Sequence, residues 1–385
     1  MEKLILKKDK CKPVLQKHPW IFAGAVQHRP VNPQSEIVEI SAGENQPVLA
    51  YGFYEHSAQL ICKIFHFGTM PEEGFQTSYW KQKLTNARKC RELVMDFRQT
   101  DTWRLCHAEA DGIPGLIADV YAGNCISFQT TCPATLSLLP VWIEIFHQMD
   151  YPFLFHRHGK EGKGKWIGQP PALPLQCKEN GLLFPADPAT GQKTGFFIDQ
   201  RDNRDIIRSL SKGRKVLNAF SYSGGFSVYA ISGGASQVVS VDISKEACRL
   251  ADAAVQLNFP EYKQHQSMAA DCFDYLRQMP GDFDFIILDP PAFAKNRAST
   301  DQAARGYKEI NLQAIRRIKA GGLLATFSCS QHISRELFQK ILFAAALDSG
   351  RNLRILRFLH QPPDHPVSIF HPEGEYLKGF LAVVD

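Results

Sequence analysis

Residues 283 to 293 read Phe283-Asp284-Phe285-Ile286-Ile287-Leu288-Asp289-Pro290-Pro291-Ala292-Phe293, and this stretch indicates the fold class. A near-continuous apolar run is typical of a parallel strand buried on both faces. Proline has no N–H for a sheet ladder, so we expect the chain to leave the sheet at Pro290. Open α/β sheets bind ligands outside the carboxyl ends of their strands, so Asp289 is expected at that edge, with Phe293 just beyond it. The alternative is a plain turn with a solvated aspartate.

Strand-like and helix-like segments alternate around this stretch. Strands are expected at residues 216–220, 238–242, 283–289 and 323–328, and helices at 226–231, 244–257, 307–318 and 334–348. Two further strands, at 353–359 and 377–384, complete the sheet. Such alternation predicts a doubly wound α/β fold with a parallel sheet.

The length of 385 residues is too great for one ordinary core and predicts two or three domains. Residues 1–68 carry short strand-like runs between turn clusters and are expected to form a small β-rich domain. Residues 75–178, with helices expected at 78–96 and 134–149, form a small α+β middle domain. Residues 179–385 carry the alternating pattern, with an Asn-Gly hairpin signal near their start.

Composition narrows the class of protein. The chain is 44% hydrophobic and 22% charged, as globular proteins are, and its net charge of +5 is compatible with a nucleic-acid partner without establishing one. Ten cysteines include no C-x-x-C pair, which disfavours a zinc site or a thioredoxin-like motif. We find no signal peptide and no membrane-spanning run, so we expect a cytoplasmic protein with free thiols.

Two basic stretches are candidates for contacts with a phosphate backbone. Six lysines fall in the first 17 residues. Residues 156–166 read as a flexible basic loop in which Arg157, Lys163 and Lys165 could meet phosphates and Trp166 could stack on a base. A solvated arm and an exposed hairpin tip are the respective alternatives.

The loop after the strand at 216–220 is the candidate cofactor site. Its small residues and the helix start behind them allow a close approach of backbone N–H groups to a ligand. The spacing is not G-x-G-x-x-G, which disfavours a nicotinamide cofactor. Asp242, at the end of the next strand, is placed to accept hydrogen bonds from ribose hydroxyls. Asp271 lies where the third strand should end, and it could accept a hydrogen bond from an adenine amino group. Asp289 lies at the end of the fourth strand. Three aspartates at the ends of neighbouring strands favour a binding site for S-adenosylmethionine over the alternative that each aspartate merely forms a turn.

Cys329 follows the strand next to that of Asp289 and is the candidate nucleophile. A thiolate can add to C6 of a pyrimidine, which lets C5 accept a methyl group. Asp289, near N3 of the base, would stabilise the adduct. The sequence indicates no base for removing the C5 proton. The alternative is a small buried hydrophobe, as cysteines often are.

Several longer strings resemble those of a known family. They are residues 18–26, 109–116, 193–201, 220–226, 289–293, 328–330, 364–367 and 376–380. They are similar to the large-subunit 23S rRNA methyltransferase I group, which are S-adenosylmethionine-dependent RNA cytosine-C5 methyltransferases with an N-terminal PUA domain. Two departures are Ala108, where the family usually has glycine, and Asn218, where many methyltransferases have an acid.

The resemblance implies an RNA-binding PUA domain, a middle domain that contacts RNA and a Rossmann-like class I methyltransferase sheet. It implies ribosomal RNA as the partner and leaves the oligomeric state open between monomer and homodimer. Pro290, Pro291 and Phe293 would contact the target base, although Phe293 could equally be a core residue. The residues expected at the cofactor are Phe197, Gln200, Arg201, Asn218, Phe220, Ser221, Tyr222 and Gly224. Two alternatives stay open: a guanine-N methyltransferase of the same fold, in which Cys329 is inert, and a non-catalytic RNA-binding or assembly protein.

Overall fold

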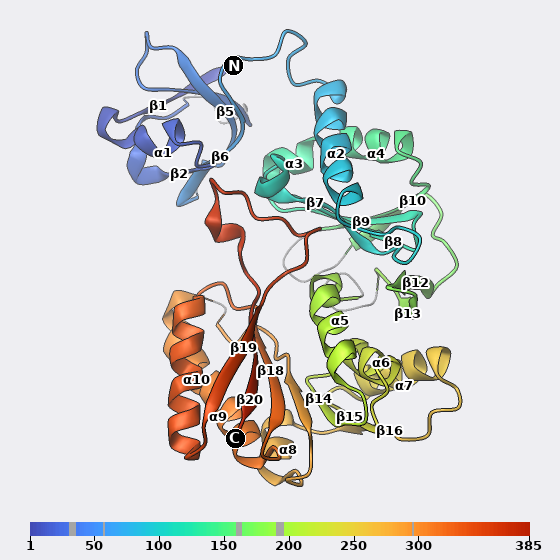
Figure 1. Cartoon of the computed structure of the whole chain (residues 1–385). Helices are drawn as coiled ribbons and strands as arrows, with labels where there is room; N and C mark the ends of the chain where they lie inside the picture. Colours follow the sequence, from blue (N-terminus) through green and yellow to red (C-terminus); the bar gives the residue numbers. More distant parts are fainter. Residues whose placement is uncertain (31–35, 57, 159–163, 190–195, 295) are drawn as a thin grey trace. The chain divides into compact units, whose positions relative to one another are not determined.

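The computed structural model describes residues 1–385 except 31–35, 57, 159–163, 190–195 and 295 (Figure 1). The chain divides into two compact units that are each built from separate segments. The first unit comprises Met1–Cys177, Ala186–Ile198 and Pro363–Gly374, and the second comprises Lys178–Pro185, Asp199–Pro362 and Glu375–Asp385. The domain boundaries expected near residues 68–75 and 178 stay predictions. No helix in the described part of the chain is long and apolar enough to cross a bilayer.

The first unit begins with a six-stranded sheet in the order β2-β6-β5-β4-β1-β3. Leu4, Leu6, Val38 and Ile40 are fully buried at alternate positions of two strands, which is the period of a half-buried sheet. The expected β-rich start of the chain is therefore present. Its elements are β1 (Glu2–Leu6), α1 (Lys12–Leu15), β2 (Trp20–Phe22), β3 (Val26–His28), β4 (Ile37–Ser41), β5 (Val48–Tyr54) and β6 (Leu60–Phe67).

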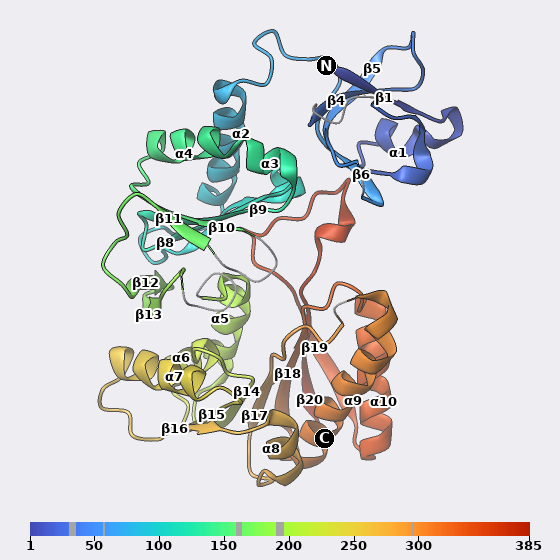
Figure 2. The same ribbon diagram turned by 180° about the vertical axis from the view of Figure 1, so that it is seen from behind.

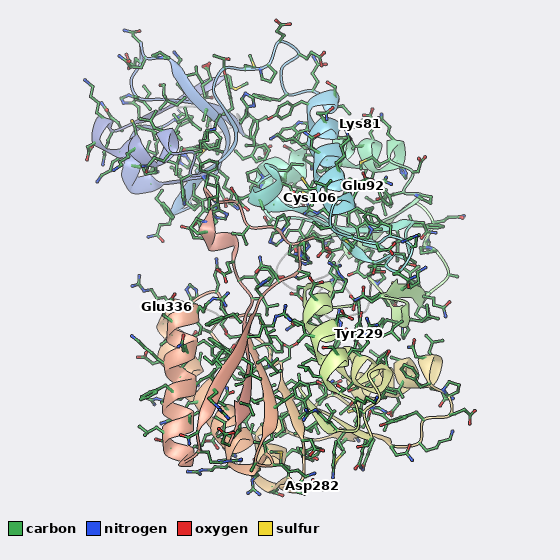
Figure 3. All side chains as sticks on the ribbon, viewed as in Figure 1. Lys81, Glu92, Cys106, Tyr229, Asp282 and Glu336 are labelled. Atoms are coloured by element: carbon green, nitrogen blue, oxygen red, sulfur yellow. The ribbon has the colours of Figure 1, made fainter. Side chains whose placement is uncertain are left out.

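A five-stranded sheet in the order β11-β10-β9-β8-β7 follows, with helices packed on it. Trp80 and Trp142, whose ring centroids lie 5.5 Å apart, join the helices to a core that includes Cys106, labelled in Figure 3. The single helix expected at 134–149 is two helices, because Pro140 lacks an N–H and starts the second one. The elements are α2 (Thr77–Glu92), β7 (Trp103–His107), η3 (Ala108–Asp111), β8 (Leu116–Tyr121), β9 (Cys125–Thr130), α3 (Pro133–Ser137), α4 (Leu139–Gln148), β10 (Phe153–Arg157) and β11 (Gly164–Ile167).

The second unit contains a seven-stranded sheet in the order β16-β15-β14-β17-β18-β20-β19. The first five strands are parallel, but β20 is antiparallel to both β18 and β19. The expectation of a parallel sheet is therefore wrong for β20, which runs opposite to the other six strands, because no helix long enough for a parallel crossover joins β19 to β20. The strands are β14 (Lys215–Ala219), β15 (Gln237–Asp242), β16 (His265–Ala269), β17 (Phe285–Leu288), β18 (Gly322–Ser328), β19 (Leu353–Leu359) and β20 (Lys378–Val384).

Helices cover both faces of this sheet, as the doubly wound pattern predicts (Figures 1 and 2). One layer holds α5 (Arg201–Leu210), α6 (Gly225–Ser232) and α7 (Lys245–Asn258), and the other holds α8 (Cys272–Gln278), α9 (Thr300–Arg317) and α10 (Arg335–Ser349). Every residue of β17 is fully buried, in agreement with its continuous apolar run. Ser334 caps α10 by accepting a hydrogen bond from the Leu337 N–H, and Gly350 ends the helix with a φ of 70°.

A short hairpin of β12 (Leu175–Glu179) and β13 (Leu182–Ala186) turns at Asn180 and Gly181, both with positive φ, as the Asn-Gly signal predicts. Glu179 is completely buried and accepts two hydrogen bonds from Arg204 of α5, at 2.8 and 2.7 Å. It also accepts one from the hydroxyl of Tyr229 on α6, at 3.0 Å, a residue labelled in Figure 3. This buried cluster ties the hairpin to α5 and α6.

The segment between β19 and β20 leaves the second unit, because Pro363–Gly374 packs with the first. Arg91 donates to both oxygens of Asp111, at 2.6 and 2.7 Å, and to the Asp364 carbonyl at 2.9 Å. The rings of Trp20 and His371 lie 4.4 Å apart. Arg91 therefore joins the string at residues 109–116 to the string at 364–367 inside one unit, and Trp20, of the string at 18–26, contacts His371 further along the same segment.

Candidate active site

The carboxyl ends of four neighbouring strands form one edge of the large sheet. Ala219 lies opposite Val241 and Leu288, and Leu288 lies opposite Thr326. The residues that follow these strands, among them Asp242 and Asp289, therefore emerge along the same edge. This is the edge at which the strand pattern predicts a ligand.

The loop after β14 is held in an unusual backbone conformation. Phe220, Tyr222 and Gly224 have φ values of 61°, 43° and 75°. Non-glycine residues rarely adopt positive φ, and such conformations cluster at ligand sites. The Ser221 N–H donates to the Val241 carbonyl at 3.0 Å, and the Tyr222 N–H donates to Asp242 at 2.9 Å. The loop is thus fixed against the end of β15.

Asp242 and Asp271 both have backbone partners within the second unit. Asp242 accepts from the N–H groups of Tyr222 and Ser244, one at each carboxylate oxygen and both at 2.9 Å. Asp271 caps α8 by accepting from Phe273 N at 2.8 Å and Asp274 N at 3.2 Å, both at Oδ1. Each carboxylate is therefore held in one orientation, which suits recognition of a ligand's hydroxyl or amino groups.

Ile243 is a candidate site residue that our sequence reasoning did not include. Its side chain is 73% exposed directly after Asp242. A large apolar side chain exposed beside a fixed carboxylate provides a surface for the flat face of a base. The available signal was an isoleucine following a strand-end aspartate.

Two polar atoms of the loop region lack a partner among the described residues. They are the buried Ser221 Oγ and Asn218 Oδ1. Buried polar atoms are normally hydrogen-bonded, so these two suit a ligand with donor groups. The Asn218 amide instead donates to Ser227 Oγ at 2.9 Å, and Ser227, Ser240 and His265 continue this buried polar chain. Asn218 is therefore partly committed to the interior.

Asp289 is tied to the residues that precede and begin α5. Gln200 Nε2 donates to Asp289 Oδ1 at 3.0 Å, and Gln200 Oε1 accepts from Asn203 Nδ2 at 2.7 Å. Arg201 is buried, and the half-buried Phe197 comes directly before η4 (Ile198–Gln200). Residues 193–195 of the same string lie outside the described residues.

On the other side of Asp289, the chain carries the residues expected at the target base. Pro290 is buried and Pro291 is exposed. Phe293 is half-buried, with its ring centroid 4.7 Å from that of Tyr307. The Ala294 N–H donates to Ser330 Oγ at 3.2 Å, so this loop is joined to the segment that carries Cys329.

Cys329 differs from the other cysteines in its surroundings. It is half-buried, whereas Cys90 is exposed and the other eight are buried. Burial raises the pKa of Cys125 and of Cys272 to about 12, which makes those thiols poor nucleophiles at neutral pH. Ser328 and Ser330, on either side of Cys329, are fully buried, and Ser330 Oγ lies 2.9 Å from the Tyr307 hydroxyl. The turn is thus fixed on both sides of the thiol.

Lys378 is a second residue that sequence reasoning missed. Its buried Nζ donates to the Ser330 carbonyl at 2.8 Å and to the Tyr376 carbonyl at 2.7 Å. It lies 49 positions after Cys329 in the sequence, so no local pattern connects the two. The only signal was its place in the string at residues 376–380.

The basic segment at 156–166 has strand residues at both of its described ends, where we expected a flexible loop, and its middle, 159–163, lies outside the described residues. Arg157 ends β10 and is 3% exposed, and it donates to Ser127 Oγ and to the Pro188 carbonyl, so its guanidinium serves the interior of the first unit. Lys165 and Trp166 belong to β11, which pairs with β10 in a hairpin. Lys165 is exposed, and Trp166 packs on Phe155 with centroids 5.0 Å apart. Lys163 lies outside the described residues.

Comparison with known proteins identifies the class. A family model described as an S-adenosylmethionine-dependent methyltransferase matches residues 129–369, and one described as a PUA-like domain matches residues 4–67. A solved S-adenosylmethionine-dependent methyltransferase from Streptococcus mutans covers 100% of both chains with a TM-score of 0.86 at 21% identity, which shows the same fold. A crystal structure of a methyltransferase complexed with SAH gives a TM-score of 0.87 at 21% identity, again over 100% of both chains. The chain is thus an S-adenosylmethionine-dependent methyltransferase with a PUA-like domain.

The curated relatives define the family more narrowly. Ribosomal RNA large subunit methyltransferase I of Aeromonas salmonicida is 37% identical over 391 residues, covering 98% of each chain. The protein of the same name from Escherichia coli K12 is 36% identical over 397 residues, covering 99% of each. The chain belongs to the ribosomal RNA large subunit methyltransferase I family.

Proposed function

We propose that this chain transfers a methyl group from S-adenosylmethionine to C5 of a cytosine in large-subunit (23S) ribosomal RNA. The relatives supply the ribosomal substrate, since they are named for it. The observation that carries the choice of cytosine is the half-buried Cys329, held in a fixed turn after β18 beside the strand of Asp289. A methyl transfer to a ring nitrogen would not need this thiol.

The proposed cofactor site uses the loop after β14 and the ends of the next two strands. The ribose hydroxyls would be held by Asp242, the adenine amino group by Asp271, and the adenine face by Ile243. The unpaired Ser221 Oγ provides a further polar contact. Bound there, S-adenosylmethionine supplies an electrophilic methyl group. The remaining expected contacts are Phe197, Gln200, Arg201, Asn218, Phe220, Tyr222 and Gly224.

In the proposed chemistry, the thiolate of Cys329 adds to C6 of the cytosine and the electron pair of the C5–C6 bond moves toward N3. Asp289, oriented by Gln200, stabilises the base at N3. C5 then takes the methyl group and gives up its proton to a base. The electron pair of that C5–H bond re-forms the C5–C6 double bond, and the C6–Sγ bond breaks to release the Cys329 thiolate. The target base has to leave its stack to reach the edge, where Pro290, Pro291 and Phe293 would contact it. Lys163, Lys165 and Trp166 would contact the RNA; Arg157 has its described partners inside the protein.

The test uses RNA transcripts of the large subunit, with the methylated nucleosides identified by mass spectrometry. Wild type and Cys90→Ala should both form 5-methylcytidine, because Cys90 is an exposed thiol on α2. Cys329→Ala should form none. RNA containing 5-fluorocytidine should form a covalent complex with wild type and with Cys90→Ala, and none with Cys329→Ala. Full activity of Cys329→Ala, or a methylguanosine product, would refute the cytosine mechanism.

The remaining parts of the proposal concern the setting. We propose that the enzyme acts in the cytoplasm, where its free cysteines stay reduced. A homodimer is the oligomeric state to test, by light scattering of the full chain. The non-catalytic assembly role predicts no binding of S-adenosylmethionine in calorimetry, whereas an enzyme binds it.

A further inference from the structure

Lys378 starts β20, and its register places it beside the nucleophile motif. It lies opposite Ser328, the residue before Cys329. Only 4% of Lys378 is exposed, and Nζ donates to the Ser330 and Tyr376 carbonyls at 2.8 and 2.7 Å. An ammonium group has three N–H donors, so these two bonds leave one position of the nitrogen for a third partner.

The charges around Lys378 come from several elements. Cys329 follows β18, Glu375 precedes β20, and Arg335 of α10 pairs with Glu375. Burial lowers the pKa of Lys378 to about 8; Cys329 and Glu375 act against this change, and Arg335 adds to it. Tyr307 is also near, because its hydroxyl lies 2.9 Å from Ser330 Oγ. Burial raises the pKa of the Tyr307 hydroxyl, and the charge of Cys329 acts in the same direction. The charge of Cys329 thus acts on both Lys378 and Tyr307.

We propose that Lys378 is the charge partner and positioning residue of Cys329, and that it accepts the proton that the thiol loses. This inference rests on the proposed function, because it assigns the group that prepares the thiol for attack on C6. A neutral amine can donate its two N–H groups to the two carbonyls and direct its lone pair to the third position. The S–H bond then breaks, an N–H bond forms on Nζ, and sulfur keeps the electron pair that bonds to C6.

The pairing also explains why a lysine is buried here. An isolated buried ammonium is costly, whereas one that neighbours a thiolate and donates to two carbonyls is compensated. The hydrogen bond from Lys378 Nζ to the Ser330 carbonyl has a second consequence, because it also fixes the turn that carries Cys329. Charge and position of the thiol therefore depend on one side chain.

The test measures the alkylation rate of individual cysteines against pH, in the full chain without RNA, by iodoacetamide labelling and peptide mass spectrometry. Cys90 is the internal reference, because it is the exposed thiol among the ten cysteines. In wild type, Cys329 should reach half its maximal rate at a lower pH than Cys90. Lys378→Met should move the Cys329 midpoint upward by on the order of one pH unit and leave Cys90 unchanged.

Three variants control for folding and for charge. Lys378→Gln keeps two N–H donors without the charge and should behave like Lys378→Met, while Lys378→Arg should keep a midpoint near that of wild type. Lys319→Met removes a lysine that pairs with Asp284 at the far end of β17, and it should change nothing at Cys329. Each variant enters the comparison when its melting temperature shows a folded chain. Lys378→Gln serves if Lys378→Met does not fold.

Two results would overturn the inference: a Cys329 midpoint in wild type at or above that of Cys90, or an unchanged midpoint in both uncharged variants. The measurement needs no methyl transfer, so it separates this inference from the proposed function. If Cys329→Ala retains full activity while the alkylation midpoint still depends on Lys378, the cytosine mechanism fails and the charge pairing stands.

Discussion

Gly224 is the position at which the cofactor loop depends most on the absence of a side chain. Its φ is +75°, and a Cβ there would lie 2.7 Å from the Ala251 Cβ and 2.9 Å from the Ala251 Cα on α7. Gly224→Ala therefore combines two penalties. The left-handed backbone costs an alanine about 1–2 kcal/mol. Forcing a methyl group into a packed contact adds roughly 1–3 kcal/mol.

Gly213→Ala is the matched control in the same unit. Gly213 also has a positive φ, +71°, but nothing lies within 4 Å of the Cβ position. It should incur only the backbone penalty of about 1–2 kcal/mol. The difference between the two variants, roughly 1–3 kcal/mol, corresponds to a melting temperature lower by about 2–12 °C for Gly224→Ala.

Calorimetry with S-adenosylmethionine extends the comparison to the site. Relief of the contact with Ala251 has to move the start of α6 and the loop before it, so affinity should fall by about tenfold or more for Gly224→Ala. Gly213→Ala should bind as wild type does. Equal melting temperatures of the two variants would show that α6 and α7 are not as close as the structure has them. Equal affinities would show that the loop does not bind the cofactor.

Three further predictions concern the supports of the two units. Glu179→Ala leaves Arg204 buried without its carboxylate and should lower the free energy of unfolding, measured in urea, by about 3–5 kcal/mol. As a control, Lys215→Met breaks a surface ion pair with Asp282 and should lower the free energy of unfolding by less than about 1 kcal/mol. Burial, with smaller contributions from His158 and Lys165, lowers the pKa of His156 to about 4. As pH drops, the imidazole therefore binds a proton in the unfolded chain before it does so in the folded chain. The free energy of unfolding should consequently fall between about pH 6.5 and pH 4. His156→Phe should weaken that pH dependence, and an unchanged slope would contradict it. Gln361→Leu removes the acceptor of the Tyr376 and Leu377 N–H groups and should cost about 1–3 kcal/mol, measured by thermal melting.

The elements that the sequence predicted correctly are those with a strong local pattern. The strand at residues 285–288 is apolar on both faces, and the helix after Ser334 has a cap, an apolar stripe and a terminal glycine. Gly52 lies within β5, and the local sequence gives no reason for a glycine there. That glycine is required by a neighbouring strand, since a Cβ there would lie 2.4 Å from Cys62 Sγ. Such a requirement is invisible in the local sequence.

Placing charged side chains was harder than placing strands. The glycines after Arg157 indicated a loop, yet the arginine is buried and bonds to Ser127 and Pro188, one of them 30 positions earlier and the other 31 later. The same limit applies to Lys378, whose proposed partners Ser330 and Cys329 lie in the turn after another strand, β18. Strand ends could be predicted from hydrophobic pattern. The side chains that orient the groups at those ends come from distant segments and could not.

The connection between β19 and β20 has hydrogen bonds in both units. Its middle, Pro363–Gly374, packs in the first unit, where Asp364 accepts from the Arg104 N–H at 2.9 Å. Its two ends are held together in the second unit, where Gln361 accepts from the N–H groups of Tyr376 and Leu377. Lys378 is the next residue after Leu377. The hydrogen bonds of Gln361, which we call the stem, therefore hold the backbone before Lys378 independently of how Pro363–Gly374 is packed. Because the stem holds the backbone on its own, loosening Asp364 should leave the alkylation profile of Cys329 unchanged, and opening the stem at Gln361 should alter it.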